Sequence, residues 1–184
     1  MSLGPFRSSA ALIVATALLS ACVSQQTYNT EVQKANTYQQ LDNQLKGEVA
    51  ADQAQITQLQ GLVRVTLANG ILFPEGGWEL DAKGKATLAK LAPVLKTFTG
   101  QTIVIKGYTD NVPIGPELRQ RFPTNVDLSK ARAQSVANEL VAGGVPPSMI
   151  SVAGFGDADP VAPNDTPAGR AKNRRVVMDI VEAK

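Results

Sequence analysis

The sequence contains no histidine and a single cysteine, Cys22. The absence of histidine removes the usual general base and the Ser-His and Cys-His arrangements of nucleophilic catalysis. One cysteine cannot form an internal disulfide, and the common zinc sites lack their ligands. The formal net charge over 184 residues is only +2, which leaves no electrostatic footprint for binding nucleic acid. We therefore expect a binding module without metal, cofactor or nucleic-acid partner, and not an enzyme.

The N-terminal segment combines a basic residue, Arg7, with a short apolar run over residues 10–19. A membrane-spanning helix needs about 20 apolar residues, so this run is typical of a secretory signal peptide. It ends in Leu19-Ser20-Ala21-Cys22, which resembles the bacterial lipobox. That resemblance implies a signal peptide over residues 1–21 and lipid attachment at Cys22, through acyl chains such as palmitate. An ordinary cleavage site that happens to contain the cysteine is the alternative.

The residue after the lipobox, Val23, bears on the destination of such a lipoprotein. In enteric lipoproteins an Asp at this position signals retention in the inner membrane, so Val23 implies export to the outer membrane. Several acyl chains anchor a protein stably. We expect a lipid-anchored protein of the outer membrane that faces the periplasm, while this sorting rule differs between bacteria.

A polar segment follows, and we assign residues 22–61 to a helical linker. Residues 24–60 contain ten Gln and no Pro. In a heptad frame that starts at Tyr28, seven of the ten a and d positions up to Leu59 are apolar, which favours a broken coiled coil. Such a stalk could make the protein a homo-oligomer. A lone amphipathic helix or a partly disordered stalk is an equal alternative.

The remaining residues, 62–184, have the pattern of one α/β domain in which helices pack on a mixed sheet. Asp81 is expected to cap a helix that runs to about Phe98. Residues 71–73 are expected to pair as a hairpin partner of the first strand. The other elements are strands over 62–67, 102–108, 149–154 and 176–181, and helices over 129–141 and 166–173.

Two residues of opposite charge, Asp110 and Arg132, form the most informative pair. Asp110 follows the strand over 102–108, and Arg132 shares a helical stripe with Leu128, Val136 and Leu140. A guanidinium beside an apolar stripe needs an anion or carbonyl acceptors, because unpaired burial is costly. An internal Asp110–Arg132 salt bridge, or extension of Arg132 to solvent, would satisfy it. A cleft that keeps both charges available for a ligand is the functional alternative.

Five motifs in order resemble the OmpA-like peptidoglycan-binding domain. The central motif is Asn125-x-x-Leu128-Ser129-x-x-Arg132-Ala133-x-x-Val136-x-x-x-Leu140. The flanking motifs are Gly107-Tyr108-Thr109-Asp110, then Gly154-Phe155-Gly156 and Pro160, and finally Gly169-Arg170-x-x-Asn173-Arg174-Arg175-Val176. The resemblance covers residues 62–184 and implies the βαβαβ-type fold of that family.

The resemblance also implies a ligand, the diaminopimelate of the peptidoglycan stem peptide. By position, Asp110 would accept hydrogen bonds from its ammonium, and Arg132 would pair with its carboxylate. Thr109 and Asn125 would bond to the stem peptide. Arg174 would approach the same carboxylate or lie as a solvated strand end. The protein would then tether the outer membrane to the cell wall.

A segment over residues 112–123 departs from many members of this family. It contains Pro113, Pro116 and Pro123, and it resembles the subgroup that includes the flagellar stator protein MotB. The apolar N-terminal run carries no acidic residue, which argues against a stator. We interpret the segment as a rim loop that narrows the cleft or contacts a partner, or as a spacer. The alternative function is therefore a signalling, secretion or motor-assembly component that meets an envelope protein through the stalk or this loop.

Overall fold

A computed structural model describes residues 25–182 of the chain. The predicted signal peptide, Cys22 and Val23 lie outside the described residues. The helices are α1 (Gln25–Gln44), α2 (Lys46–Ala50), α3 (Ala82–Leu95), α4 (Pro116–Arg119), α5 (Asn125–Ala142) and α6 (Pro167–Asn173), with 3-10 turns η1 (Asn69–Ile71) and η2 (Pro147–Met149). The strands are β1 (Ala54–Leu59), β2 (Leu62–Ala68), β3 (Gln101–Gly107), β4 (Ile150–Gly154) and β5 (Arg175–Glu182).

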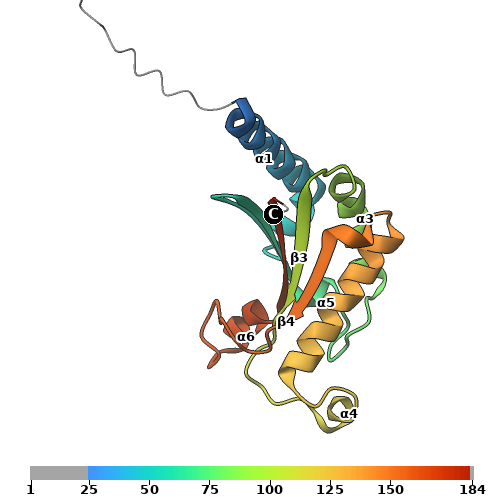
Figure 1. Cartoon of the computed structure of the whole chain (residues 1–184). Coiled ribbons are helices and arrows are strands. Elements are labelled where there is room, and N and C mark those ends of the chain that lie inside the picture. The colour runs from blue at the N-terminus through green and yellow to red at the C-terminus, as the bar shows by residue number, and fades with distance from the viewer. Residues whose placement is uncertain (1–24, 183–184) are drawn as a thin grey trace, which may run out of the picture.

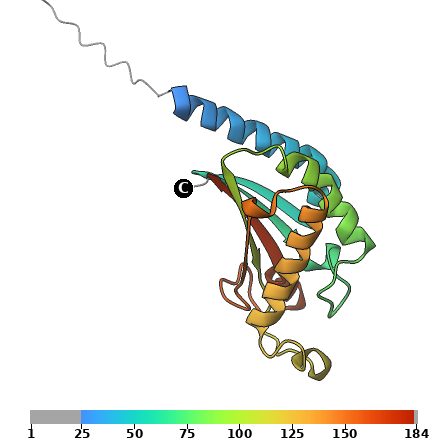
Figure 2. The ribbon, with the colours of Figure 1, turned by 45° about the vertical axis from the view of Figure 1, so that its right-hand side comes forward.

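The strands form one mixed sheet in the order β1-β2-β5-β3-β4. Only β3 and β4 pair in parallel, and the other neighbours are antiparallel. Helices α1, α3 and α5 cover one face of the sheet, and α6 lies beside its other face (Figures 1 and 2). The predicted α/β class with helices on a mixed sheet is confirmed.

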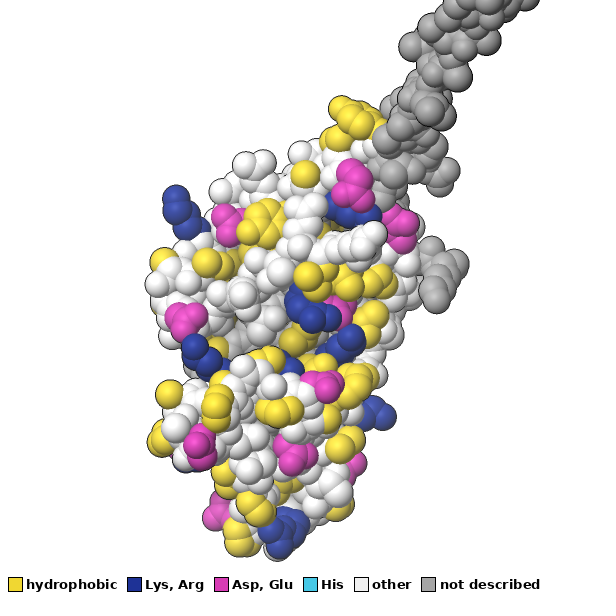
Figure 3. All heavy atoms as spheres, turned by 90° about the vertical axis from the view of Figure 1, so that its left-hand side faces the viewer, with side chains coloured by type: hydrophobic (Ala, Val, Ile, Leu, Met, Phe, Trp, Pro, Cys, Tyr) yellow, Lys and Arg dark blue, Asp and Glu magenta, His cyan; other side chains and the backbone are white. Residues whose placement is uncertain are grey.

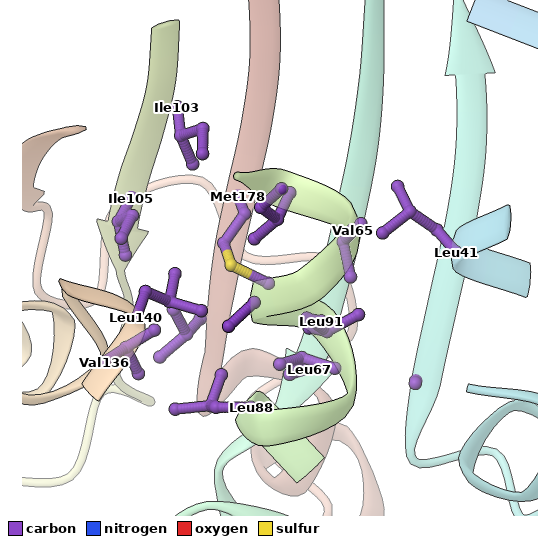
Figure 4. Close-up of a cluster of buried hydrophobic side chains, with 14 of the residues drawn as sticks. Leu41, Val65, Leu67, Leu88, Leu91, Ile103, Ile105, Val136, Leu140 and Met178 are labelled. Carbon is purple, nitrogen blue, oxygen red and sulfur yellow. The ribbon is translucent and has the colours of Figure 1, made fainter. Parts of the chain in front are cut away.

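The core lies between the sheet and the three covering helices. Figure 4 shows Leu88 and Leu91 of α3 directed between Leu67 of β2 and Met178 of β5. Each of these four side chains is completely buried. Burial of a leucine side chain stabilises a fold by about 1.5–3 kcal/mol, so this contact between helix and sheet is a main source of stability.

The N-terminal helix belongs to this core. Thr37 and Leu41 of α1 are buried, and so is Leu45, which directly follows the helix. Their spacing of four residues continues one helical face. Of the positions expected to form a coiled-coil seam, Ala35 is exposed and Leu45 packs inside the domain. The apolar face of the second half of the helix therefore packs within the domain, whereas Tyr28 and Val32 of the first half are exposed.

The predicted helical linker over 22–61 is wrong for residues 54–59, which form β1. These residues alternate between the two faces of the sheet and pair with β2 from Ala54–Leu67 to Leu59–Leu62. Gly61 adopts a φ of 83° in the turn between the strands, a conformation that glycine adopts without steric cost. The sheet begins at Ala54, before the boundary predicted at residue 62.

The prediction of a hairpin partner over residues 71–73 is also wrong. Asn69 begins a 3-10 turn, in which the Leu72 and Phe73 N–H groups donate to the Asn69 carbonyl at 3.0 and 2.9 Å. The side chains of Ile71, Leu72 and Phe73 are buried in the core. Their apolar run reflects burial beneath α3 and not strand pairing.

Two helix starts determine where the later side chains lie. The Asp81 carboxylate accepts from the Gly84 N–H at 2.7 Å, which confirms the predicted cap, and the helix ends at Leu95 before the expected Phe98. The α5 helix begins at Asn125, four residues before the predicted start. Its N-cap residue Thr124 and the side chain of Asp127 form a reciprocal capping box.

The other face of the sheet carries charged residues. Figure 3 views the molecule from the side of β1, β2 and α6 and shows basic and acidic side chains intermixed. Asp179 on this face is bonded to Arg64 and Lys106. Across the part of the chain that the structure describes, no helix is long and apolar enough to cross a membrane.

Candidate binding cleft

A cleft of about 820 Å³ lies where β2 and β3 end and β5 begins. Its lining includes Leu118 of α4, Leu128 of α5 and Arg170 of α6, three helices that are labelled in Figure 1. Its lining contains every residue that the sequence predicted for the site: Thr109, Asp110, Asn125, Arg132 and Arg174. These residues come from three separate parts of the fold, so the cleft exists only in the folded domain.

A glycine at the end of β3 allows the strand and α5 to approach closely. A Cβ atom on Gly107 would lie 2.0 Å from the carbonyl oxygen of Ser129 in α5, which is far inside van der Waals contact. The Ser129 hydroxyl accepts from the Gly156 N–H, and the Thr109 N–H donates to the Gly156 carbonyl at 2.7 Å. This packing brings the residues after β3 against the helix that carries Arg132.

The carboxylate of Asp110 is paired with Arg174 and not with Arg132. The Arg174 Nη1 lies 2.5 Å from Asp110 Oδ2, and the Val112 N–H donates to Asp110 Oδ1 at 3.2 Å. The side chain of Asp110 is 10% exposed, whereas that of Arg174 is 41% exposed. An internal Asp110–Arg132 salt bridge, one of the two structural solutions considered above, is therefore wrong. The exposed guanidinium can leave at little cost, since water can solvate it.

Arg132 is a buried cation without an anionic partner among the described residues. It is 6% exposed, and its Nε donates to the Gly77 carbonyl at 2.8 Å. The pKa of Arg132 is lowered to about 10, chiefly by burial and secondly by the charge of nearby Arg174, while Asp110 opposes the shift. The guanidinium remains cationic at neutral pH, so an anion that enters the cleft would offset the cost of its burial.

Asn125 acts on the cleft through the backbone of the adjoining loop. Its side-chain amide donates to the carbonyls of Asp110 at 3.4 Å and of Val112 at 3.2 Å. Since Asn125 is the first residue of α5, these bonds tie the loop after β3 to the helix that carries Arg132. The side chain therefore positions Asp110, and its contact with a ligand stays a prediction.

The rim loop over residues 112–123 forms one wall of the cleft. Ile114 and Phe122 are buried with Leu128 in a small apolar cluster that is separate from the main core. The Trp78 and Phe122 rings meet edge to face, with centroids 5.2 Å apart, and Arg121 lies 4.6 Å from the Trp78 centroid. Trp78 thus packs against the loop. The loop therefore packs as a wall of the cleft, and its role as a partner contact or as a spacer stays a prediction.

The sequence analysis missed Asn69, which also lines the cleft. Asn69 followed by Gly70 indicates a turn, and nothing in that pattern points to a binding role. Asn69 is 6% exposed, and neither its Oδ1 nor its Nδ2 has a hydrogen-bond partner among the described residues. Within the same residues, no cluster of three or more His, Cys, Asp or Glu side chains could hold a metal ion.

Comparisons with known proteins agree with this arrangement. The sequence model of the OmpA family matches residues 72–174, more than half of the chain. The chain is 32% identical to the probable lipoprotein YiaD of Escherichia coli over 136 residues, which are 74% of this chain and 59% of that protein. It is 39% identical over 118 residues to the peptidoglycan-binding protein ArfA of Mycobacterium tuberculosis, with 64% of this chain and 34% of ArfA covered. The chain therefore spans less than two thirds of either relative.

A solved structure extends the likeness to the fold. The cell wall anchor of the T6SS from Pseudomonas aeruginosa superposes with a TM-score of 0.69 at 30% sequence identity. The match covers 78% of this chain and 97% of that one. It therefore extends beyond the 103 residues of the family match.

Proposed function

Because the chain belongs to the OmpA family, we propose that it binds peptidoglycan non-covalently through the diaminopimelate of the stem peptide. As a lipoprotein it would tether the outer membrane to the cell wall. The names of its relatives support this proposal, since ArfA is a peptidoglycan-binding protein and the T6SS protein is a cell wall anchor.

The observation that carries the proposal is the unequal pairing of charges in the cleft. Arg132 is buried without an anion, and Asp110 holds a single cation that is well exposed. A ligand with both an ammonium and a carboxylate would replace Arg174 at Asp110 and supply the missing anion to Arg132. The planar guanidinium suits bidentate contact with a carboxylate. The end of diaminopimelate that is free of the main peptide chain carries these two groups on one carbon.

The proposed role involves no chemical reaction. Wall hydrolysis at this cleft would need a second carboxylate beside Asp110 or an activated nucleophile. The charged partner of Asp110 is Arg174. Two other acids line the cleft: Asp81 is engaged as a helix cap, and Glu75 is exposed. A zymogram with purified sacculi tests this part, and clearing bands would contradict it.

The proposed location depends on the N-terminal segment. The lipobox ending in Cys22 and the following Val23 favour a lipid anchor in the outer membrane, and YiaD carries the name of a probable lipoprotein. Labelling cells with a radioactive or clickable palmitate tests the anchor, and Cys22→Ser should abolish the label. Fractionation of the labelled membranes then separates outer-membrane from inner-membrane localisation.

Co-sedimentation with diaminopimelate-type sacculi tests the cleft. The chain without its predicted signal peptide, with Cys22→Ser to keep it soluble, should pellet with sacculi. Asp110→Ala and Arg132→Ala should each remain in the supernatant. Matched controls are Asp165→Ala, at an exposed acid outside the cleft, and Lys130→Ala, at an exposed cation of the same helix as Arg132. Both controls should pellet like the unaltered chain. Soluble wild type, or pelleting of the two cleft variants, would contradict the proposal.

A second candidate function is anchorage of a protein partner at the wall, which the T6SS relative supports. The rim loop is the candidate contact, because Val112 and Glu117 are exposed on an ordered wall. Deleting the loop would remove Ile114 and Phe122 and so disturb the cleft itself. Glu117→Lys with Gln120→Lys alters only exposed positions. This pair should leave sacculus binding intact, and loss of an envelope phenotype in cells would then assign the loop to a partner.

A further inference from the structure

The base of the cleft contains a buried side-chain amide whose hydrogen-bonding capacity is unused. Both polar atoms of the Asn69 side chain are sealed from solvent and unpartnered within residues 25–182. Asn173 gives the opposite case within the same domain. It is 1% exposed, its Oδ1 accepts from the N–H groups of Val161 and Ala162, and its Nδ2 donates to Ala162 and Asn164. Buried polar groups in proteins are rarely left unpaired, so Asn69 requires an explanation.

The strand ladder places Asn69 next to the charged part of the cleft. The Asn69 N–H donates to the Arg174 carbonyl at 3.0 Å, and on the other side of Arg174 the Tyr108 N–H donates to the Arg175 carbonyl at 2.9 Å. Asn69, Arg174 and Thr109 therefore follow one another across the ends of β2, β5 and β3. Successive side chains of a strand alternate between faces, and all three of these line the cleft.

A second unused group lies on the far side of Arg174. The Thr109 hydroxyl is buried and has no hydrogen-bond partner among the described residues. Thr109 immediately precedes Asp110, the residue proposed to hold the ligand ammonium. The cleft thus has an amide and a hydroxyl, both without a partner among the described residues, on the two neighbours of Arg174 across the strand ends.

We propose that Asn69, together with Thr109, forms a subsite that binds a backbone amide of the stem peptide beside diaminopimelate. An Asn side chain offers one acceptor and one NH₂ donor, which matches the N–H and C=O of a peptide group. The cleft then recognises diaminopimelate in peptide linkage and not only the free amino acid. This inference rests on the proposed function, since it concerns the ligand of that same site.

Access to the subsite follows from the exchange at Asp110. In the free protein the Arg174 guanidinium pairs with Asp110, and the Arg174 backbone lies between those of Asn69 and Thr109 at the strand ends. When the ligand ammonium takes its place, this 41% exposed side chain moves toward the ligand carboxylate or solvent. The movement opens this part of the cleft to the peptide group that joins diaminopimelate to the preceding residue of the stem peptide.

Isothermal titration with two probes tests the proposal. The probes are free meso-diaminopimelate and the tripeptide L-Ala-γ-D-Glu-meso-diaminopimelate, each added to the soluble chain described above. The unaltered chain should bind the tripeptide more tightly. Asn69→Leu should weaken tripeptide binding about tenfold, the size expected for two ordinary hydrogen bonds, and should leave free diaminopimelate unchanged. Thr109→Val, which keeps the side-chain shape, should weaken the tripeptide by roughly threefold for one hydrogen bond.

Thermal unfolding of the same variants separates a binding role from a structural one. Replacing an unpaired polar group by an apolar group of similar shape should leave Tm unchanged or raise it, so Asn69→Leu should not lower Tm. Asn173→Leu is the matched control and should lower Tm, because it leaves several backbone groups unpaired. A lowered Tm with intact tripeptide binding in Asn69→Leu would overturn the inference. Equal binding of both probes by the unaltered chain would overturn it while the proposed function stands. Failure to bind either probe would overturn both.

Discussion

Two buried aspartates, Asp179 and Asp110, lie on opposite faces of the sheet and are paired in different ways. Asp179 is 4% exposed. Arg64 donates to it through Nε at 2.6 Å and Nη2 at 2.8 Å, and Lys106 donates at 2.8 Å. Asp110 is 10% exposed and has one cationic partner, Arg174. Burial alone would raise the pKa of Asp179, but the hydrogen bonds from Arg64 and Lys106 hold it below its ordinary value.

The difference separates a structural carboxylate from one that can bind a ligand. Arg64, Lys106 and Asp179 lie on adjacent strands, and their bonds join β2, β5 and β3. Both oxygens of Asp179 are engaged by side-chain cations. Asp110 sits in a cleft, and its partner is exposed enough to leave. A buried acidic residue is therefore informative about function through the number and exposure of its partners more than through its burial.

The largest expected effect is the loss of stability on removing Asp179. Asp179→Ala leaves Arg64 and Lys106 without their shared anion and should lower the free energy of unfolding by about 3 kcal/mol. Urea unfolding followed by circular dichroism measures the change. The folded protein should still pellet with sacculi, because the two sites lie on different faces. Loss of binding in folded Asp179→Ala would show that the two carboxylates are coupled.

The second prediction is that Asp110, unlike Asp179, contributes more to binding than to stability. Asp110→Ala should weaken binding of the tripeptide by at least about tenfold, as expected for hydrogen bonds to a charged group. It should lower the free energy of unfolding by less than about 1 kcal/mol, since the freed Arg174 is solvated. Titration calorimetry and urea unfolding on one preparation give both values. A stability loss as large as that of Asp179→Ala would show that Asp110 is a structural carboxylate as well.

The third prediction concerns the stability of the protein at acid pH. A carboxylate whose pKa is lower in the folded than in the unfolded chain stabilises the fold above its unfolded value, 3.8 for Asp179. That contribution decreases as the pH falls below about 4. It is lost completely once the folded protein also takes up the proton, at a lower pH. Asp179→Asn should therefore flatten the fall in unfolding free energy across this range, measured by urea unfolding at a series of pH values. An unchanged slope would show that other carboxylates control the acid transition.

The smallest expected effect is that of salt. At about 0.5 M salt the screening length is ~4 Å, so exposed charges no longer attract a ligand over a distance. Binding to sacculi should weaken several-fold on going from low salt to this concentration. The difference in stability between the unaltered chain and Asp179→Ala should change little, because Asp179 is buried against its partners. Salt-independent binding would argue that apolar contacts with the rim loop dominate.

The later part of the fold could be predicted because its signals are local. Asp81 caps α3, the apolar run after Gln101 is a central strand, and Gly143 follows the end of α5. The grouping of Asp110, Arg132 and Arg174 came from motif resemblance, and the pairing of Asp110 could not be derived from it. Which cation meets Asp110 depends on how α5 and the start of β5 are placed around it in the folded domain, which no spacing along the chain encodes.

The N-terminal part was harder because its polar composition fits more than one structure. Gln-rich sequence favours a helix over a strand, yet Ile56 lies in β1 because pairing with β2 overrides local preference. Likewise, Leu72 reads as part of a strand but packs beneath α3. Nothing in the sequence singles out Asn69, because the lack of hydrogen-bond partners for its side-chain amide among the described residues is a property of the folded structure.

The packing of α1 would have a mechanical consequence if the chain is anchored at both ends, as proposed above. Figure 1 places the start of α1 far from α4 and the first turn of α5, whose residues line the cleft. Thr37 and Leu41 in the second half of the helix are buried, while Tyr28 and Val32 in its first half are exposed. Tension applied at Gln25 would detach α1 before it disturbs the central strands. A helix of 20 residues that unravels from about 1.5 to about 3.3 Å per residue gains roughly 35 Å. The chain between the proposed N-terminal anchor and the domain could lengthen by that amount while the ligand stays bound in the cleft.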